Sequence, residues 1–265
     1  MNIQVLKGLL AVSVFGLAMQ AGAYEVTIYD GDGYTGSGAA GEDQETEPGM
    51  VNSQVWDMEG FFLDNQSLTM VGGFDYVNGE GGYSAGDIFL AVGVTPSYGA
   101  VADRSGNANA VVDNTYGYNY VLDMDYTNLT YNLLEINATT QVSTGYYKQN
   151  EGSSPFQYVS GAVADESGDV ISVASGDFTI EEVTEYNGFA GEKHYVLAGL
   201  DLSVLMAEAT SGTTFYSHFT MGCGNDNLMG SWEVPEPASI ALLSMGLFGL
   251  WFARRKQRSA ATFSA

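Results

Sequence analysis

Residues 82–86, GYSAG, have the spacing of a nucleophile elbow, in which a serine hydroxyl attacks a carbonyl carbon. His194 and His218 follow later in the chain, in the order that an α/β-hydrolase requires. However, the elbow needs a helix directly after the serine, whereas residues 87–92 form an apolar run that predicts a strand. In a chain with 34 glycines, five matching letters are a weak signal. We therefore predict that Ser84 lies in a surface turn.

His218, Cys223 and Asp226 are candidate metal ligands because they lie close together in the sequence. A zinc site needs three or four convergent ligands, and the chain has only two histidines in total. Phe215 and Phe219 belong to an alternating pattern, which predicts a strand with His218 on its opposite, solvated face. This pattern favours a solvated histidine over a ligand.

Calcium is the other metal that the residue types suggest, because carboxylate and amide oxygens are its usual ligands. Asp30 and Asp32 open a loop, but the fifth and sixth positions of an EF-hand pattern are here Tyr and Thr. Asn225 and Asp226 are two further oxygen donors. We expect no cofactor, with calcium at these residues as the alternative.

The chain is strongly acidic, with a formal net charge of −24. Residues 24–234 hold three basic and 31 acidic residues, a formal balance of −28. Such a surface repels nucleic acid and anionic lipid. We exclude nucleic acid as a partner and attribute the acidity to solubility in a salty medium, in preference to specific calcium binding.

Short strands separated by turns are predicted through most of this body, with Gly72-Gly73 and Asn78-Gly79 as hairpin turns. The predicted strands are residues 24–29, 51–58, 61–63, 67–71, 74–77, 87–94, a pair within 118–135, 142–148, 156–164, 170–175, 178–183, 195–200 and 214–221. Residues 201–210 form the one helix-like window, with Leu202, Leu205 and Met206 on one side and Asp201 as its N-cap. The pattern predicts an all-β fold, an antiparallel β-sandwich of a jelly-roll-like kind. Residues 30–48, rich in Gly, Asp and Glu, are expected to form a mobile loop.

Cys223 is the only cysteine, so no intrachain disulfide stabilises the domain. The single thiol is expected to be buried beside a turn, and pairing between two chains is the alternative.

The N-terminus has the three parts of a secretory signal peptide. Lys7 supplies a positive charge, residues 8–19 are apolar, and Ala21 and Ala23 complete an A-x-A cleavage pattern. We predict a signal peptide at residues 1–23, followed by an exported domain at residues 24–233.

The C-terminus combines three signals in a fixed order. Pro235, Glu236 and Pro237 precede an uncharged apolar run at residues 238–253, which is followed by a basic cluster. The basic cluster contains Arg254, Arg255, Lys256 and Arg258. Sixteen helical residues span roughly 24 Å, close to the thickness of a hydrocarbon core. We predict a single transmembrane helix, and basic residues beside a membrane span stay on the cytoplasmic side.

Residues 234–258 resemble the PEP-CTERM sorting signal of Gram-negative bacteria, in which the same three parts have the same order. The resemblance implies processing by an exosortase-type membrane protease and an association with exopolysaccharide and biofilm matrix. A plain tail anchor would not need Pro-Glu-Pro, a sortase signal would contain Leu-Pro-x-Thr-Gly, and a GPI signal would usually lack the basic tip.

Residues 217–230, SHFTMGCGNDNLMG, resemble the ending of the last strand in exported, exosortase-dependent surface domains. The resemblance implies a structural turn, in which Gly224 permits the reversal of the chain. The side chains of Asn225 and Asp226 are then expected to satisfy backbone donors.

These features predict a protein exported through the Sec machinery and transiently anchored in the inner membrane. Residues 259–265 form its cytoplasmic tail, and the domain then reaches the cell surface or the extracellular matrix. We expect a structural or interaction protein, bound to exopolysaccharide, and not an enzyme. A secreted or surface-tethered hydrolase, or a carbohydrate-binding module that acts on matrix glycan, is the alternative. Among 32 acidic residues, the sequence singles out no catalytic pair of carboxylates.

Overall fold

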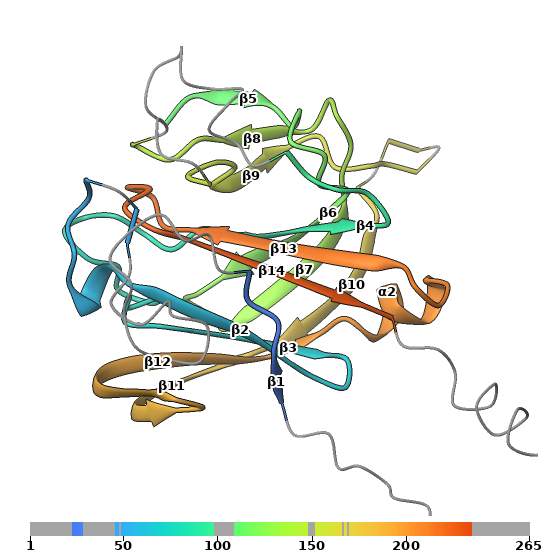
Figure 1. The fold of residues 1–265 in the computed structure, drawn as a ribbon. Coiled ribbons are helices and arrows are strands. Elements are labelled where there is room, and N and C mark those ends of the chain that lie inside the picture. The colour runs from blue at the N-terminus through green and yellow to red at the C-terminus, as the bar shows by residue number, and fades with distance from the viewer. Residues whose placement is uncertain are drawn as a thin grey trace, which may run out of the picture.

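The computed structural model describes residues 23–28, 46–47, 49–97, 109–147, 152–165, 167–168 and 170–234. In this part of the chain, antiparallel strands form three sheets that lie one above another (Figure 1). The predicted all-β antiparallel class is confirmed, and the two larger sheets are consistent with a sandwich. Most of the predicted signal peptide, residues 30–45 of the predicted loop and the predicted transmembrane helix lie outside the described residues.

The strands of each sheet are given in their spatial order, so that each strand pairs with the next. The first sheet contains β1 (Tyr24–Glu25), β2 (Met58–Asp64), β3 (Ser67–Gly72), β12 (Phe189–Asp201) and β11 (Thr179–Tyr186). The second sheet contains β10 (Ser172–Asp177), β7 (Thr130–Glu135), β6 (Tyr120–Asp125), β4 (Ile88–Val92), β13 (Thr214–Thr220) and β14 (Asn227–Glu233). The third sheet contains β5 (Val111–Asp113), β8 (Gln141–Ser143) and β9 (Gln157–Ser160). Two short helices, η1 (Gln54–Trp56) and α2 (Ser203–Glu208), complete the described elements.

Hairpins between consecutive strands make up most of this order, including β2 with β3, β6 with β7, and β13 with β14. A jelly roll consists of two Greek keys, in which a long connection returns a strand to lie beside a distant one. The jelly-roll comparison therefore holds only for the long-range pairs, which include β3 with β12, β4 with β13 and β7 with β10.

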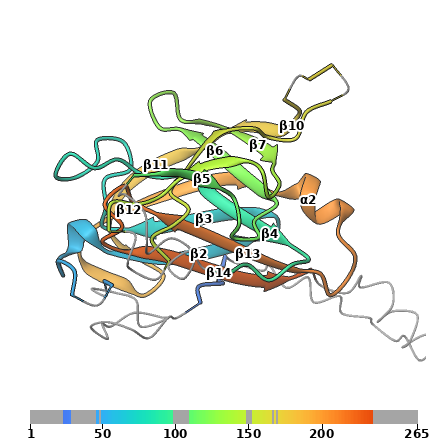
Figure 2. The same ribbon diagram turned by 90° about the horizontal axis from the view of Figure 1, so that it is seen from above.

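The core follows from the alternation of side chains along each strand. In β4, Ile88 and Leu90 face the main core between the first and second sheets, whereas Phe89 and Ala91 face the third sheet. All four side chains are buried, so the second sheet is covered on both faces. Figure 2, the view from above, shows the third sheet across the second. The third layer explains why β4 is a continuous apolar run and not an alternating one.

Two predicted strands are wrong. Residues 74–77 form a turn in which the Asp75 carboxylate accepts hydrogen bonds from the backbone of Val77 and Asn78. Gly72-Gly73 and Asn78-Gly79 therefore do not close hairpins. Residues 51–57 are loop and η1, and strand pairing starts only at Met58. Local side-chain hydrogen bonds compete here with the ladder of a sheet.

The helix-like window contains α2, which is shorter than predicted. Leu205 and Met206 are buried on one side, as the spacing predicted. Asp201 accepts a hydrogen bond from the Ser203 N–H, although the N-cap position itself is Leu202.

The two ends of the described fold meet at β14. Ile28 donates its N–H to the Met229 carbonyl, and Ser231 donates to the Val26 carbonyl, each at 2.8 Å. Val26 also donates to Phe61 in the first sheet, at 2.8 Å. Residues 26–28 thus bond one larger sheet to the other. At Gly230, a Cβ atom would lie 2.5 Å from the Ser217 Oγ, so this close approach requires glycine.

We expect Trp232→Ala to destabilise the fold by about 3–5 kcal/mol, because it empties a large buried site in the last strand. The Trp232 side chain is 5% exposed and stacks on Phe215 with the ring centroids 5.3 Å apart. Urea unfolding of a chain of residues 24–234 measures the effect. The matched control, Glu233→Ala at an exposed position, should change stability by less than about 0.5 kcal/mol. Equal stability of the two variants would contradict the assignment of β14 as a core strand.

Candidate functional site

The folded body reaches the start of the C-terminal signal. Val234 donates its N–H to the Thr213 carbonyl and accepts from the Gly212 N–H, both at 3.0 Å. Pro235, the first residue of Pro-Glu-Pro, follows at once. Pro235, Glu236 and Pro237 lie outside the described residues, as do Arg254, Arg255 and Lys256.

Among the residues that the structure describes, no helix has the length and apolar content to cross a membrane.

The segment before β14 is a turn, as predicted, but it connects β13 to β14 and is not the ending of the last strand. Gly224 has a φ of +66°, which glycine adopts without strain. Asn225 pairs with the Val51 backbone through both ends of its amide, with bonds of 3.0 Å and 2.9 Å. The Asp226 carboxylate accepts from the backbone N–H groups of Met58 and Asn227. Both side chains therefore position the chain that leads into β2, and this use competes with calcium ligation.

Calcium candidates Asp30 and Asp32 lie outside the described residues. In the described part of the chain, no group of three or more His, Cys, Asp or Glu side chains is arranged to hold a metal ion.

His194 belongs to a buried ionic cluster in the first sheet. Its Nδ1 lies 2.7 Å from Glu59 Oε1, and both side chains are fully buried. The Gln54 amide donates to the same carboxylate at 2.5 Å. Removing one partner of such a pair leaves a buried charge behind, so we assign these residues to the stability of the fold.

His218 does lie on the face opposite Phe219, but the prediction of a solvated ring is wrong. The side chain is fully buried under the third layer, where it packs against Tyr118 with the ring centroids 5.6 Å apart. Its Nε2 hydrogen-bonds to the Gly152 carbonyl. Burial lowers the pKa of His218 to about 4, so the ring is neutral at pH 7.

Ser84 is exposed in a turn, as predicted, and β4 follows it where an elbow would need a helix. His194 lies on the same face of the first sheet as Val196. His218 lies beneath the third sheet. The two histidines are therefore on different sides of the molecule, and neither is grouped with Ser84 in the way that a hydrolase triad would require.

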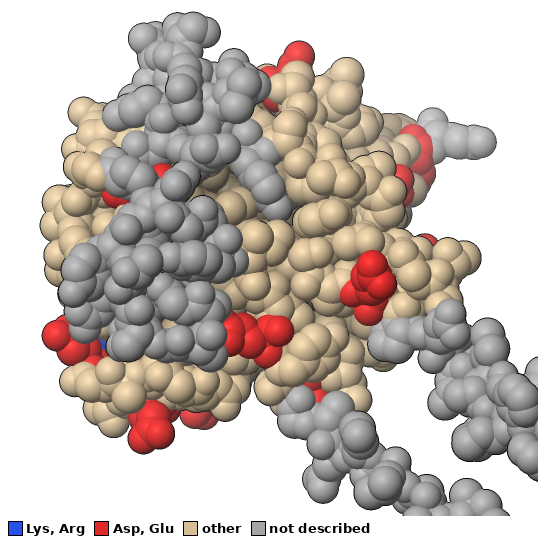
Figure 3. Space-filling view, in the orientation of Figure 1, with Lys and Arg blue, Asp and Glu red and all other residues tan. Residues whose placement is uncertain are grey.

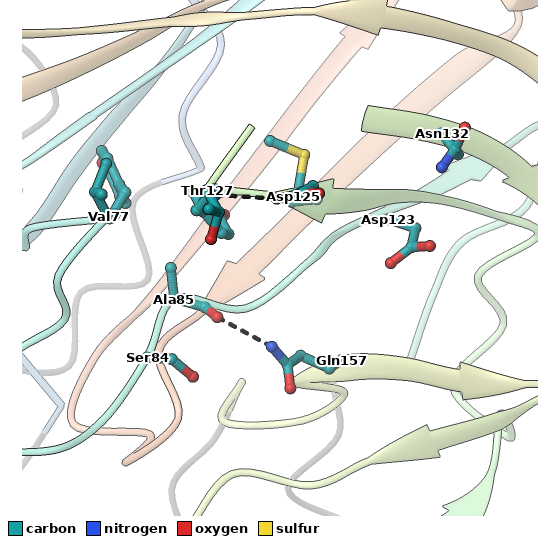
Figure 4. A pocket seen from close by; sticks show the side chains of 11 residues that line it. Val77, Ser84, Ala85, Asp123, Asp125, Thr127, Asn132 and Gln157 are labelled. Atoms are coloured by element: carbon teal, nitrogen blue, oxygen red, sulfur yellow. Dashed lines mark hydrogen bonds between the residues drawn. The ribbon is translucent and has the colours of Figure 1, made fainter. Parts of the chain in front are cut away.

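The structure places Ser84 in a groove of about 480 Å³ at one end of the second sheet (Figure 4). The residues that line it are Tyr76, Val77, Ser84, Ala85, Asp123, Met124, Asp125, Tyr126, Thr127, Asn132 and Gln157. We call this set the groove. Its volume is within the range of about 300–1,000 Å³ that is typical of small-molecule sites.

Polar side chains stand on two sides of the groove. Asp123 and Asn132 are directly opposite each other on β6 and β7, and Figure 4 shows them on the same side of the groove. Ser84 and Gln157 lie across from them, and Gln157 donates to the Ala85 carbonyl at 3.2 Å. Burial raises the pKa of Asp123, and the nearby Asp125 raises it further.

A buried carboxylate supports the groove from behind. Asp87 is 3% exposed. Its two oxygens accept from the backbone N–H groups of Met124 on β6 and Tyr158 on β9, at 3.0 Å and 2.8 Å. Burial raises the pKa of Asp87 to about 7, although both hydrogen bonds favour the ionised form. Asp87 therefore joins the second sheet to the third and is not itself a groove residue.

Two turns of the same sequence pattern form one wall of the groove. Residues 75–78, DYVN, and residues 125–128, DYTN, each begin with an aspartate that accepts from the backbone two and three residues later. In both turns the asparagine side chain also donates to that aspartate. The central residues, Tyr76 and Tyr126, stack with their centroids 6.5 Å apart.

The sequence patterns identified Ser84 but none of the other groove residues. The repeated Asp-Tyr-x-Asn pattern is the signal that could have linked the two walls. Nothing in the sequence relates Asp123 or Asn132 to Ser84, because β6, β7 and the turn before β4 meet only through sheet pairing.

Comparison with protein families matches residues 233–256 to the PEP-CTERM protein-sorting motif. No curated protein and no solved structure matches the chain. The chain therefore carries a PEP-CTERM, exosortase-dependent sorting signal, as its resemblance predicted. It is an exported protein with a membrane-anchored sorting signal, and exosortase is the membrane protein that processes it.

We expect Asp87→Asn to change how stability depends on pH. Because burial raises the folded-state pKa to about 7, the stabilising contribution of Asp87 is complete below about pH 4 and is lost as the pH rises through 7. The amide of the variant does not titrate, so the free energy of unfolding of wild type minus that of the variant should fall by about 2–4 kcal/mol between pH 4 and pH 8. Chemical denaturation across this range measures the difference.

The matched control for this prediction is Asp177→Asn, at the exposed end of β10. Its stability should follow that of wild type at every pH. A constant difference between wild type and Asp87→Asn would contradict the raised pKa.

We expect Cys223 to resist thiol reagents in the folded protein. The side chain is 2% exposed, and burial raises the pKa of its thiol to about 11, so little thiolate forms at pH 8. Labelling with a chromogenic disulfide reagent should therefore be slow until the protein unfolds. A Ser84→Cys variant, at an exposed position, should gain one rapidly labelled thiol. Fast labelling of wild type, or a disulfide-linked dimer, would favour pairing between chains instead.

Proposed function

We propose that this protein is a structural or interaction protein of the cell surface or extracellular matrix, associated with exopolysaccharide and biofilm, without catalytic activity. The observation that supports this proposal is the junction at residues 233–234, where the last described strand, β14, meets the sorting motif. The folded domain would therefore be delivered together with the signal.

The proposed route has three steps. The Sec machinery exports the chain, and signal peptidase cuts after Ala23. Residues 238–253 then hold the chain in the inner membrane, with Arg254 and its basic neighbours in the cytoplasm. Exosortase next processes the tail and releases the domain toward the surface or matrix.

The surface supports a role outside the cell and among polymers. Figure 3 shows acidic side chains at several separate places on one face of the molecule. Lys193 is the only lysine or arginine within the described ranges, and it pairs with Glu182 at 2.8 Å. Like-charged molecules repel one another, so the protein should stay soluble at high local concentration.

A carbohydrate-binding module is the second candidate function, and the groove favours it. Its polar rim and the tyrosines that line it are features of sites that bind hydroxyl-rich ligands. The hydrolase alternative has no comparable support, because the elbow geometry is absent at Ser84.

Replacing Pro235, Glu236 and Pro237 together with alanine should block processing. In the native host, wild type is expected to lose its C-terminal segment and to leave the membrane fraction. The variant should stay in the membrane at full mass, because exosortase would no longer recognise it. Intact-mass measurement and cell fractionation check both parts.

Glu208→Ala, at the exposed end of α2, is the matched control and should be processed like wild type. If the wild-type tail stays uncut and all three proteins are distributed identically among the cell fractions, the proposed route is wrong.

A further inference from the structure

Three polar side chains in the groove have unused hydrogen-bonding capacity. Ser84 Oγ, the Asp123 carboxylate and the Asn132 amide make no hydrogen bond to any other described residue, whereas Gln157 is already bonded to the Ala85 carbonyl. A hydroxyl, a carboxylate and an amide together supply both donors and acceptors. Asp123 and Asn132 lie on one side of the groove, and Ser84 lies on the other (Figure 4).

The wall between these groups is held in place before any ligand arrives. Tyr126 donates its hydroxyl to the Gly86 carbonyl at 2.7 Å and stacks on the fully buried Tyr76. The two Asp-Tyr-x-Asn turns fix the backbone on either side of these rings. Binding to a fixed wall costs little conformational entropy.

A metal ion does not suit this cavity. Both oxygens of Asp125 accept hydrogen bonds within their own turn, from the Thr127 and Asn128 N–H groups and from the Asn128 amide. Asp123 is then the one groove carboxylate with both oxygens available, and calcium needs six to eight oxygen ligands.

An anionic ligand does not suit it either. Asp123 and Asp125 both line the groove, and no lysine or arginine is among its lining residues. A carboxylated or sulfated sugar would meet like charge on entry. The remaining chemistry is a neutral ligand that carries several hydroxyl groups on an apolar ring.

We propose that the groove binds a segment of uncharged oligosaccharide. The hydroxyls of the ligand pair with Asp123, Asn132 and Ser84, and a sugar ring lies against Tyr126, the partly exposed tyrosine of the groove. This inference rests on the proposed function and names the class of polymer that the surface protein would contact.

The groove also lies far from Val234, the last residue described before the predicted membrane segment. Along β13, Thr214 pairs with Glu233 beside Val234, while Met221 at the other end bridges Ala85 in the groove. The 7 residues of β13 span about 23 Å at roughly 3.3 Å per residue. Figures 1 and 2 show α2 and the end of β14 together at one end of the sandwich. The groove is thus at the end of the sandwich opposite Val234.

Saturation-transfer difference NMR on the full chain in lipid nanodiscs tests the proposal. The probes are cellohexaose, maltohexaose and mannohexaose as neutral hexamers, and hexagalacturonate as the anionic one. We expect signal transfer to at least one neutral hexamer and none to hexagalacturonate. Asn132→Ala should weaken that binding by about 3- to 10-fold, because it removes one hydrogen-bonding side chain.

The matched control is Glu135→Ala, which is exposed on the same strand, β7, but does not line the groove. It should bind as wild type does. Asp123→Ala should weaken binding like Asn132→Ala, and thermal unfolding should show both variants folded.

Three results would overturn the inference. They are no transfer to any neutral hexamer, stronger transfer to hexagalacturonate, or equal effects of Asn132→Ala and Glu135→Ala. The proposed function fails separately, through the fractionation of the Pro-Glu-Pro variant. A protein that reaches the surface but binds no neutral hexamer would contradict only the groove proposal.

Discussion

Hydrogen bonds along both edges of β14 are the constraint on which the rest of the fold depends. On one edge β14 pairs with β13, and on the other it bonds to residues 26–28, which also bond to Phe61 in the first sheet. The last strand and the first described residues thus close the main core together. A sheet edge that is paired in this way offers no free backbone groups for pairing with another chain.

The third sheet is attached differently, through buried ionisable side chains as well as apolar packing. Asp87 accepts from Tyr158 on β9, and His218 bonds to the Gly152 carbonyl beside the same layer. Burial raises the pKa of Asp87 and lowers that of His218, so their contributions to stability have opposite slopes with pH. The contribution of Asp87 is lost as the pH rises from about 4 to 7, and that of His218 as it falls from about 6.5 to 4. The two contributions therefore change stability in opposite directions over this range.

Sequence patterns predicted the strand class and the apolar side of α2, and a resemblance predicted the turn at residues 224–226, because each depends on neighbours in sequence. It failed where a distant contact decided the outcome. The alternation around His218 predicts a solvent-exposed face, as a two-layered sandwich would have. A third sheet covers that face instead. Residues 74–77 have strand-forming side chains, yet the Asp75 carboxylate accepts hydrogen bonds from the backbone N–H groups of Val77 and Asn78. The groove escaped prediction for the same reason, since three separate strands and turns contribute to it.

The groove and the start of the sorting motif lie at opposite ends of the β13–β14 hairpin. β13 and β14 run from Val234, the last described residue before the end of the sorting motif, to the far end of the second sheet. β13 is paired on both sides, because it lies between β4 and β14. A ligand bound at the far end would meet the domain both before and after the tail is processed, since the groove contains no residue of the motif at 233–256. Processing would therefore change where the binding site is displayed and leave the site itself intact.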